Sequence, residues 1–441
     1  MKPLPLTPLE EYLLCEDRPG YPGWICSRLR FHGTLQRDVL ARAFAAAVAR
    51  HPLARAVVRR GRFGRPAWMW PEGVGPLPVD WRARAADGGW PEFPSHGLEA
   101  APGFRLVVAE EAAITEVYVQ SHHAVMDGAG GFGLIEEILL HYAHELGVGV
   151  GPRVLKPERL THRGRLAASW AQLLARLPGL ALGLALNWQL ARRTVAPLAA
   201  GKFSTPHPPP AVVRLTLTAA DYQRLRAGAR RAGAGVNDVL LRDLFAAIRA
   251  WRDARGVVAP LDWIRLAVPV SLRTRADVAL PAANGFGMVA LDRRAKSLAN
   301  RERLLRRARE DMDMVKQWRL GLTFPALLAL RRRWPGGIAA YSAHPVTRAT
   351  AVLTNDGKIF AHSPFLNAAR RVALPGAVLE DVAVSLPCRP GTAALVAVGV
   401  YAGTMFADLT YDSHTLTADQ AGKLLGAFEA QLRLTMDAET G

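Results

Sequence analysis

Residues 121–133, SHHAVMDGAGGFG, carry two histidines, an aspartate and four glycines between an apolar run and an amphipathic one. Two interpretations compete for this stretch. The glycines at 128, 130 and 133 match G-x-G-x-x-G, the phosphate-binding loop of a dinucleotide-binding fold. His122, His123 and Asp127 instead form the pattern His-His-x-x-x-Asp-Gly, which fits an acid–base site at a strand-to-helix junction. The surrounding sequence decides between the two.

The sequence downstream of the glycines does not favour a dinucleotide site. Such a site needs an acidic residue about 20 residues further on, at the end of a second strand, to hold the ribose. Here that position offers Glu158, which follows a proline and ends no clear strand. With 39 glycines in the chain, a chance match is expected. The acid–base interpretation is therefore favoured, and an NAD(P)-binding oxidoreductase is kept as a remote alternative.

The composition predicts an ordered protein of a reducing compartment. Half of the 441 residues are hydrophobic and 21% are charged, which excludes a disordered chain. Cys15, Cys26 and Cys388 follow no metal-ligand spacing, so we expect no metal site. The first residues lack the apolar core of a signal peptide. We therefore expect a cytoplasmic protein, at most peripheral to the inner membrane.

The chain is strongly basic, with a formal net charge of +18. Such a field attracts nucleic acid, acidic lipid, acidic carrier proteins or phosphate-bearing cofactors. The basic residues are spread rather than striped, and no common nucleic-acid-binding motif occurs, so we expect no nucleic-acid partner. Whether the charge serves a function or only reflects the composition stays open.

Alternating strand and helix patterns fill two regions, which we expect to form two lobes with a cleft between them. Residues 1–150 form the first lobe, 151–210 a basic connector that ends in prolines at 206–210, and 211–441 the second lobe. Strand patterns occur at 24–31, 104–110, 114–121, 212–217, 264–270, 349–353, 394–401 and 406–411, and helical spacing at 35–50, 134–146, 219–232, 236–252, 301–319 and 418–434.

The connector holds an apolar segment at 177–191, flanked by arginines. It falls short of the roughly 20 residues that a membrane-spanning helix needs. The segment either packs against the body of the protein or, with Trp170 and Trp188, touches a lipid surface.

The motif HHAVMDG resembles the HHxxxDG signature of the acyltransferase superfamily with the chloramphenicol-acetyltransferase-like fold. This superfamily includes nonribosomal-peptide condensation domains, alcohol O-acyltransferases and bacterial wax ester synthase/diacylglycerol acyltransferases. Six further segments are similar to segments of this superfamily. The last of them, at 353–357, departs from the usual SNxG turn by carrying Thr354 and Asp356. In chain order these segments are LTPLEEYLLCED (6–17), RHPLARA (50–56), VNDV (236–239), PVSLR (269–273), NGF (284–286) and LTNDG (353–357).

The resemblance implies an α/β (α+β) fold of two chloramphenicol-acetyltransferase-like lobes, each a mixed sheet flanked by helices, with the active site in a tunnel between them. It implies acyl transfer from a thioester to a small alcohol or amine acceptor. The donor would be an acyl-CoA or an acyl group on a phosphopantetheinyl carrier protein, with no permanently bound cofactor, and we expect a monomer. The alternative is a condensation-like scaffold that docks carrier proteins without catalysis. Arginines at 301–309 and 331–333 are candidates to receive donor phosphates.

His123 is the candidate general base. The mechanism requires no acyl-enzyme, which fits the absence of a G-x-S-x-G elbow from the chain. His122 is expected to be structural, and Gly128 to lie near the oxyanion. Asp127 would brace the loop by pairing with Arg50, Arg55 or Arg273, between which the sequence does not choose. Asn237 and Asp238 either shape the pocket or cap a helix. The candidate pocket residues are Asn237, Asp238, Asn284 and Asn355.

Overall fold

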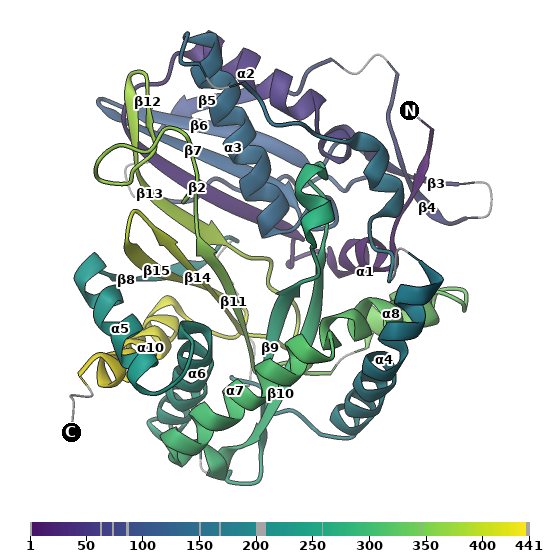
Figure 1. Ribbon diagram of the computed structural model, residues 1–441, viewed down its shortest axis with the longest axis vertical. Coiled ribbons are helices and arrows are strands. Elements are labelled where there is room, and N and C mark those ends of the chain that lie inside the picture. Colours follow the sequence, from purple (N-terminus) through teal and green to yellow (C-terminus); the bar gives the residue numbers. More distant parts are fainter. Residues whose placement is uncertain are drawn as a thin grey trace.

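The computed structural model describes residues 2–61, 64–72, 75–84, 88–149, 151–166, 169–199, 209–257, 259–344 and 346–437. The described chain builds two six-stranded sheets with helices packed against them (Figure 1). Each sheet contains both parallel and antiparallel neighbours, which confirms the expected α/β fold of two mixed sheets. Residues 206–208 of the proline cluster lie outside the described ranges.

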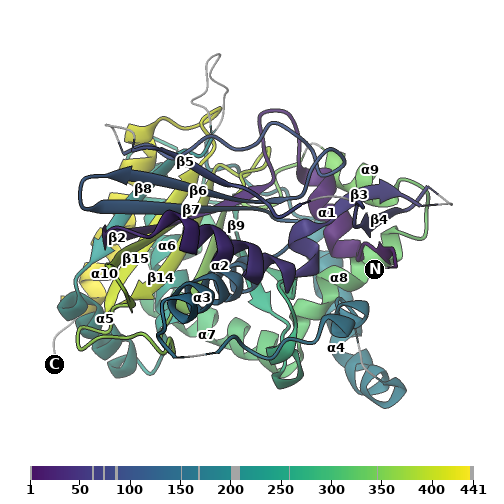
Figure 2. The same ribbon diagram turned by 90° about the horizontal axis from the view of Figure 1, so that it is seen from above.

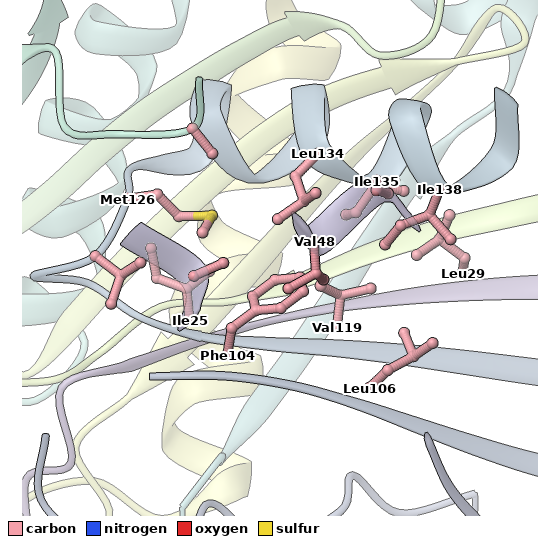
Figure 3. Packing of buried hydrophobic residues seen from close by; sticks show 14 of the residues in the cluster. Ile25, Leu29, Val48, Phe104, Leu106, Val119, Met126, Leu134, Ile135 and Ile138 are labelled. Carbon is pink, nitrogen blue, oxygen red and sulfur yellow. The ribbon is translucent and has the colours of Figure 1, made fainter. Parts of the chain in front are cut away.

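The first sheet has the order β12-β13-β2-β7-β6-β5. Helices α2 (Arg37–Ala49) and α3 (Gly128–Glu145) lie side by side on one of its faces (Figures 1 and 2). Figure 3 shows their apolar side chains packed against those of the sheet. The strands are β2 (Trp24–Gly33), β5 (Val79–Ala83), β6 (Phe104–Glu111), β7 (Ile114–His122), β12 (Ala373–Leu374) and β13 (Ala377–Ser385).

The second sheet has the order β10-β9-β11-β14-β15-β8. Its helices are amphipathic and bury one face in a second core. The strands are β8 (Val212–Leu217), β9 (Trp263–Ser271), β10 (Phe286–Arg294), β11 (Ala351–Lys358), β14 (Ala394–Tyr401) and β15 (Thr404–Tyr411). The helices are α5 (Ala219–Arg231), α6 (Val236–Asp253), α7 (Arg301–Gln317) and α10 (Ala418–Asp437).

The chain does not divide between the lobes at a single point. Strand β13 pairs antiparallel with β2 along most of its length, so residues 373–385 lie in the first sheet although they follow 211 in sequence. The expected second lobe of 211–441 departs from the structure here, because the pairing of β13 with β2 joins segments that are far apart in the sequence. Side chains of β15 then join the lobes: Asp408 accepts from the Val384 amide at 2.7 Å and Thr410 from the Leu386 amide at 3.0 Å.

Smaller elements close one end of the molecule. Three short strands form a separate sheet, and a capping box at Thr7 and Glu10 starts α1. Among the helices of the described ranges, none is long and apolar enough to cross a membrane. These elements are β1 (Leu4–Pro5), β3 (Val57–Arg60), β4 (Pro66–Met69), α1 (Pro8–Glu16), α4 (Trp170–Ala191), α8 (Thr323–Arg331) and α9 (Gly337–Ala343).

Candidate active site

A cavity of about 590 Å³ lies between the two sheets, and the loop that joins β7 to α3 forms part of its wall. His123 follows the last residue of β7, and Gly128 begins α3, so the motif spans the junction. The opposite wall comes from β9, β10 and β11 of the second sheet. His123, Asp127, Gly128, Arg273 and Asn355 all line this cavity.

The His123 ring is fixed in both orientation and tautomer. Its Nδ1 lies 3.3 Å from the Met126 carbonyl oxygen. Because a carbonyl only accepts, Nδ1 carries the hydrogen of the neutral ring and Nε2 keeps its lone pair. The ring also stacks on Phe286 at 5.3 Å with an interplanar angle of 11°. Burial lowers the pKa of His123 from its ordinary value of 6.5, against the opposing charge of Asp127, so the ring is neutral at pH 7.

Asp127 caps α3 and joins the two lobes. Its Oδ1 accepts from the Gly130 amide at 2.9 Å, and its Oδ2 accepts from the Gly285 amide at 2.8 Å. Arg273 donates to both oxygens, at 2.7 and 2.8 Å. Such a bidentate pair at a half-buried site holds the loop firmly.

Arg273 is therefore the arginine that pairs with Asp127. Arg50 lies instead 3.1 Å from Glu137 on the far side of α3. Arg55 ends a 3-10 turn that starts at Pro52, outside the cavity wall.

Asn284 ties the second lobe to the backbone of the motif. Its Nδ2 donates to the carbonyl oxygens of His123 and Ala124, both at 2.9 Å. A side chain on Gly130 would collide with the Ala283 carbonyl, so the glycine allows the two segments to meet. Asn284 thus positions the loop rather than lining the cavity that holds His123.

His122 is fully buried and faces away from that cavity. Its Nε2 lies 3.2 Å from Asp17 Oδ2, and its Nδ1 accepts from the Ala124 amide at 3.1 Å. Burial raises the pKa of Asp17, but the His122 and Gly23 hydrogen bonds outweigh it and hold that pKa below its ordinary value. Sequence reasoning did not single out Asp17, although it closes the LTPLEEYLLCED segment.

A second carboxyl group, Asp356, faces the cavity from β11. Burial, then the charges of Asp127 and Asp408, raise its pKa to about 7. A bulge between Asn355 and Gly357 turns this part of the strand, and Asn355 Oδ1 accepts from the Gly357 amide at 3.0 Å. The sequence signal for Asp356 was its charge at the variable position of the turn.

Asn237 and Asp238 do not reach the cavity. They begin α6, where Asp238 Oδ2 accepts from the Gly235 amide at 2.9 Å in a capping interaction. The sequence left open whether Asp238 shapes the pocket or caps a helix, and the structure shows that it caps α6.

A second cavity, of about 1180 Å³, meets the first at Val270, Ser271, Arg273 and Phe286. Its wall is basic, and among the described residues that line it Asp277 is the sole acid. The stretches at 301–309 and 331–333 line neither cavity. The cations of the second cavity are Arg159, Arg163, Arg165, Arg176, Arg273, Lys316 and Arg319, with His162 beside them.

The arrangement excludes the dinucleotide interpretation of the glycines. Strand β7 is antiparallel to both of its neighbours, whereas a dinucleotide loop opens a parallel βαβ unit. Gly130 serves the contact with Ala283, and a side chain on Gly133 would meet nothing within 4 Å.

The chain shares its fold with condensation domains and related proteins of known structure. The chain superposes on the first condensation domain of the CDA synthetase with a TM-score of 0.70 and 17% identity, over 99% of this chain and 97% of that one. Polyketide synthase associated protein 5 from Mycobacterium tuberculosis gives 0.63 and 17%, over 99% of both chains. The starter condensation domain of rhizomide synthetase, solved with C8-CoA and Leu-SNAC, gives 0.67 and 16%, over 99% and 95%.

In sequence, the chain is similar to the uncharacterised Mycobacterium tuberculosis protein Rv2305, at 28% identity over 288 residues. The match spans 62% of this chain and 62% of that relative, which is less than two thirds of its length. No family model matches the chain.

Proposed function

We propose that the protein is an acyltransferase that moves an acyl group from a thioester to an acceptor hydroxyl or amine. The observation that carries the proposal is the His123 ring, held by Met126 and Phe286 with Nε2 left as the proton acceptor beside the inter-lobe cavity. The fold is shared with a starter condensation domain whose structure contains C8-CoA, which supports coenzyme A or a carrier-bound pantetheine as the donor group.

The proposed reaction needs no covalent enzyme intermediate. Nε2 of His123 accepts the proton of the acceptor O–H or N–H while the acceptor atom bonds to the thioester carbon. The resulting oxyanion lies near the N-terminus of α3, where Gly128 and Ala129 line the cavity. The carbon–sulfur bond then breaks, and the imidazolium returns its proton to the thiolate. Asp127, Arg273 and Asn284 act by positioning the loop.

The test is a turnover assay with a panel of acyl-CoAs and alcohol or amine acceptors, following thiol release and product formation. We expect His123→Ala to lower kcat/KM by about 10²–10⁴-fold, the usual worth of a general base. The matched control is His362→Ala, which removes an exposed histidine outside the cavity. Because burial lowers the pKa of His123, we expect kcat/KM of the wild type to fall only below pH 6.5.

Undiminished turnover in His123→Ala would contradict the mechanism. Carrier-protein binding without any thiol release by the wild type would instead favour the scaffold alternative.

A further inference from the structure

Helix α4 exposes a stripe of large apolar side chains. Trp170, Leu174, Leu177, Leu184 and Trp188 have exposed fractions of 80%, 63%, 48%, 41% and 61%. Their spacing places them on one face, since a helix turns about 100° per residue. A surface helix of a globular protein normally turns this face toward the core.

The opposite face of α4 carries glycines and is buried. A side chain on Gly179 would collide with the Trp318 carbonyl, and one on Gly183 with Thr323. The helix therefore lies tightly against the region between α7 and α8, as Figures 1 and 2 show. The glycine face permits this close contact, which leaves the leucines and tryptophans outside.

The charged residues of α4 and of the two positions after it are all cationic: Arg176, Arg192 and Arg193. No acidic residue occurs within Trp170–Ala191. Arg192 stacks over the Trp188 ring at 3.9 Å, and Arg176 from the inner side of α4 lines the second cavity together with Arg319. Burial, then the charge of Arg319, lowers the pKa of Arg176, as expected of two cations without a nearby acid.

We propose that the outer face of α4 docks on an anionic lipid bilayer. Tryptophan prefers the membrane interface, leucine partitions below it, and arginine pairs with headgroup phosphate. A second copy of the chain fits less well, because two such cationic surfaces repel each other. In the docked state the second cavity, whose wall α4 forms through Gln172 and Arg176, lies on the side of α4 that faces away from the lipid. The inference is independent of the proposed reaction.

The experiment is sedimentation of the full chain with vesicles of equimolar phosphatidylglycerol and phosphatidylcholine, and with vesicles of phosphatidylcholine alone. We expect binding to the anionic vesicles that weakens with added salt and is much weaker on phosphatidylcholine. One chain carrying Trp170→Ser, Leu174→Ser and Trp188→Ser should lose at least about tenfold in partition coefficient, because three interfacial side chains are removed.

The control chain carries Val257→Ser, Leu261→Ser and Leu434→Ser, which are exposed to 42%, 63% and 54% away from α4. It should bind like the wild type, and both variants should keep the wild-type thermal transition. Failure of the wild type to bind anionic vesicles, or equal binding by the α4 variant, overturns the proposal. A wild-type dimer in light scattering that the α4 substitutions dissociate, without lipid binding, would show an interface between copies instead. Absence of acyl transfer would leave the vesicle result unaffected.

Discussion

His123 owes its proposed role to contacts that leave it one possible tautomer. A histidine with both nitrogens facing water would titrate near 6.5 and rotate freely. Here the Met126 carbonyl holds Nδ1, and Phe286 fixes the plane of the ring. Both contacts depend on the loop that Asp127 and Asn284 hold in place, so the position of the His123 ring depends on the backbone of this loop.

The ion pair of Asp127 and Arg273 should stabilise the folded state measurably. Asp127→Asn keeps the shape and the helix cap but removes the charge, and Arg273→Gln removes the partner. Because each single change leaves a half-buried charge uncompensated, we expect each to cost about 3 kcal/mol in the free energy of unfolding. The double variant should cost less than the sum of the two, with a coupling of about 2 kcal/mol, measured by urea denaturation. Additive effects would show that the pair is not coupled.

At the scale of elements, the helices from 219, 236, 301 and 418 begin at the predicted residues, whereas α3 and α4 begin earlier than predicted. The apolar spacing predicted a helix from residue 134, whereas α3 begins at Gly128. The first turn of α3 is glycine-rich and has no apolar period, but the Asp127 carboxylate caps it. Similarly, the segment expected at 177–191 belongs to a helix that starts at Trp170, where the Ser169 side chain accepts from the Gln172 amide.

The glycine face of α4 gives a prediction for this element. Gly183→Ala introduces a methyl group where the buried Thr323 side chain already lies. We expect it to lower the free energy of unfolding by about 1–3 kcal/mol through overpacking and to make α4 more susceptible to limited proteolysis.

Gly426→Ala in α10 is the matched control, because its new methyl group meets nothing within 4 Å. Alanine is the better helix former, so this change should stabilise the chain by about 0.5–1 kcal/mol. Equal effects of the two substitutions would show that α4 is not held by its glycines.

At the scale of the whole molecule, carboxyl groups meet where the lobes join. Asp356 has a pKa of about 7, and Asp408, buried in β15, has one of about 6 because burial outweighs the nearby Arg214. A raised pKa means that the folded state holds the proton more tightly than the unfolded state does. Such a group makes stability fall as pH rises from its ordinary value toward the raised one.

Asp356→Asn should remove the part of this pH-dependent fall in stability that the Asp356 carboxyl group causes. Between pH 3.8 and about 7, the folded wild type binds the Asp356 proton that the unfolded chain has lost. We therefore expect the stability advantage of the variant over the wild type to grow from pH 5 to pH 8 by on the order of 2 kcal/mol, measured by denaturant unfolding. An advantage that stays constant over this range would contradict the raised pKa.

The alternation of strands and helices was predictable because it depends on residue patterns within short stretches of the sequence. The pattern at 24–31 became β2, and that at 394–401 became β14 at the predicted bounds. Strand β10 was not predicted, because its alternating pattern ends in charged residues at 292–294 that form ion pairs or pack in the sheet. Strand β13 was missed because acidic residues at 380 and 381 interrupt its apolar run.

The amino-acid sequence determined the strand–loop–helix junction at 121–133, the identity of its histidines and aspartate, and the α/β class, since periodicity and capping act over a few residues. The tertiary structure decided which distant segments meet: Arg273 pairs with Asp127, 146 residues away, Asp17 with His122, and β13 with β2 in the first sheet. It also decided that α4 turns its apolar face outward. These contacts join distant segments. Their pairing depends on which surfaces are buried together, and a pattern within a short stretch of sequence does not determine this.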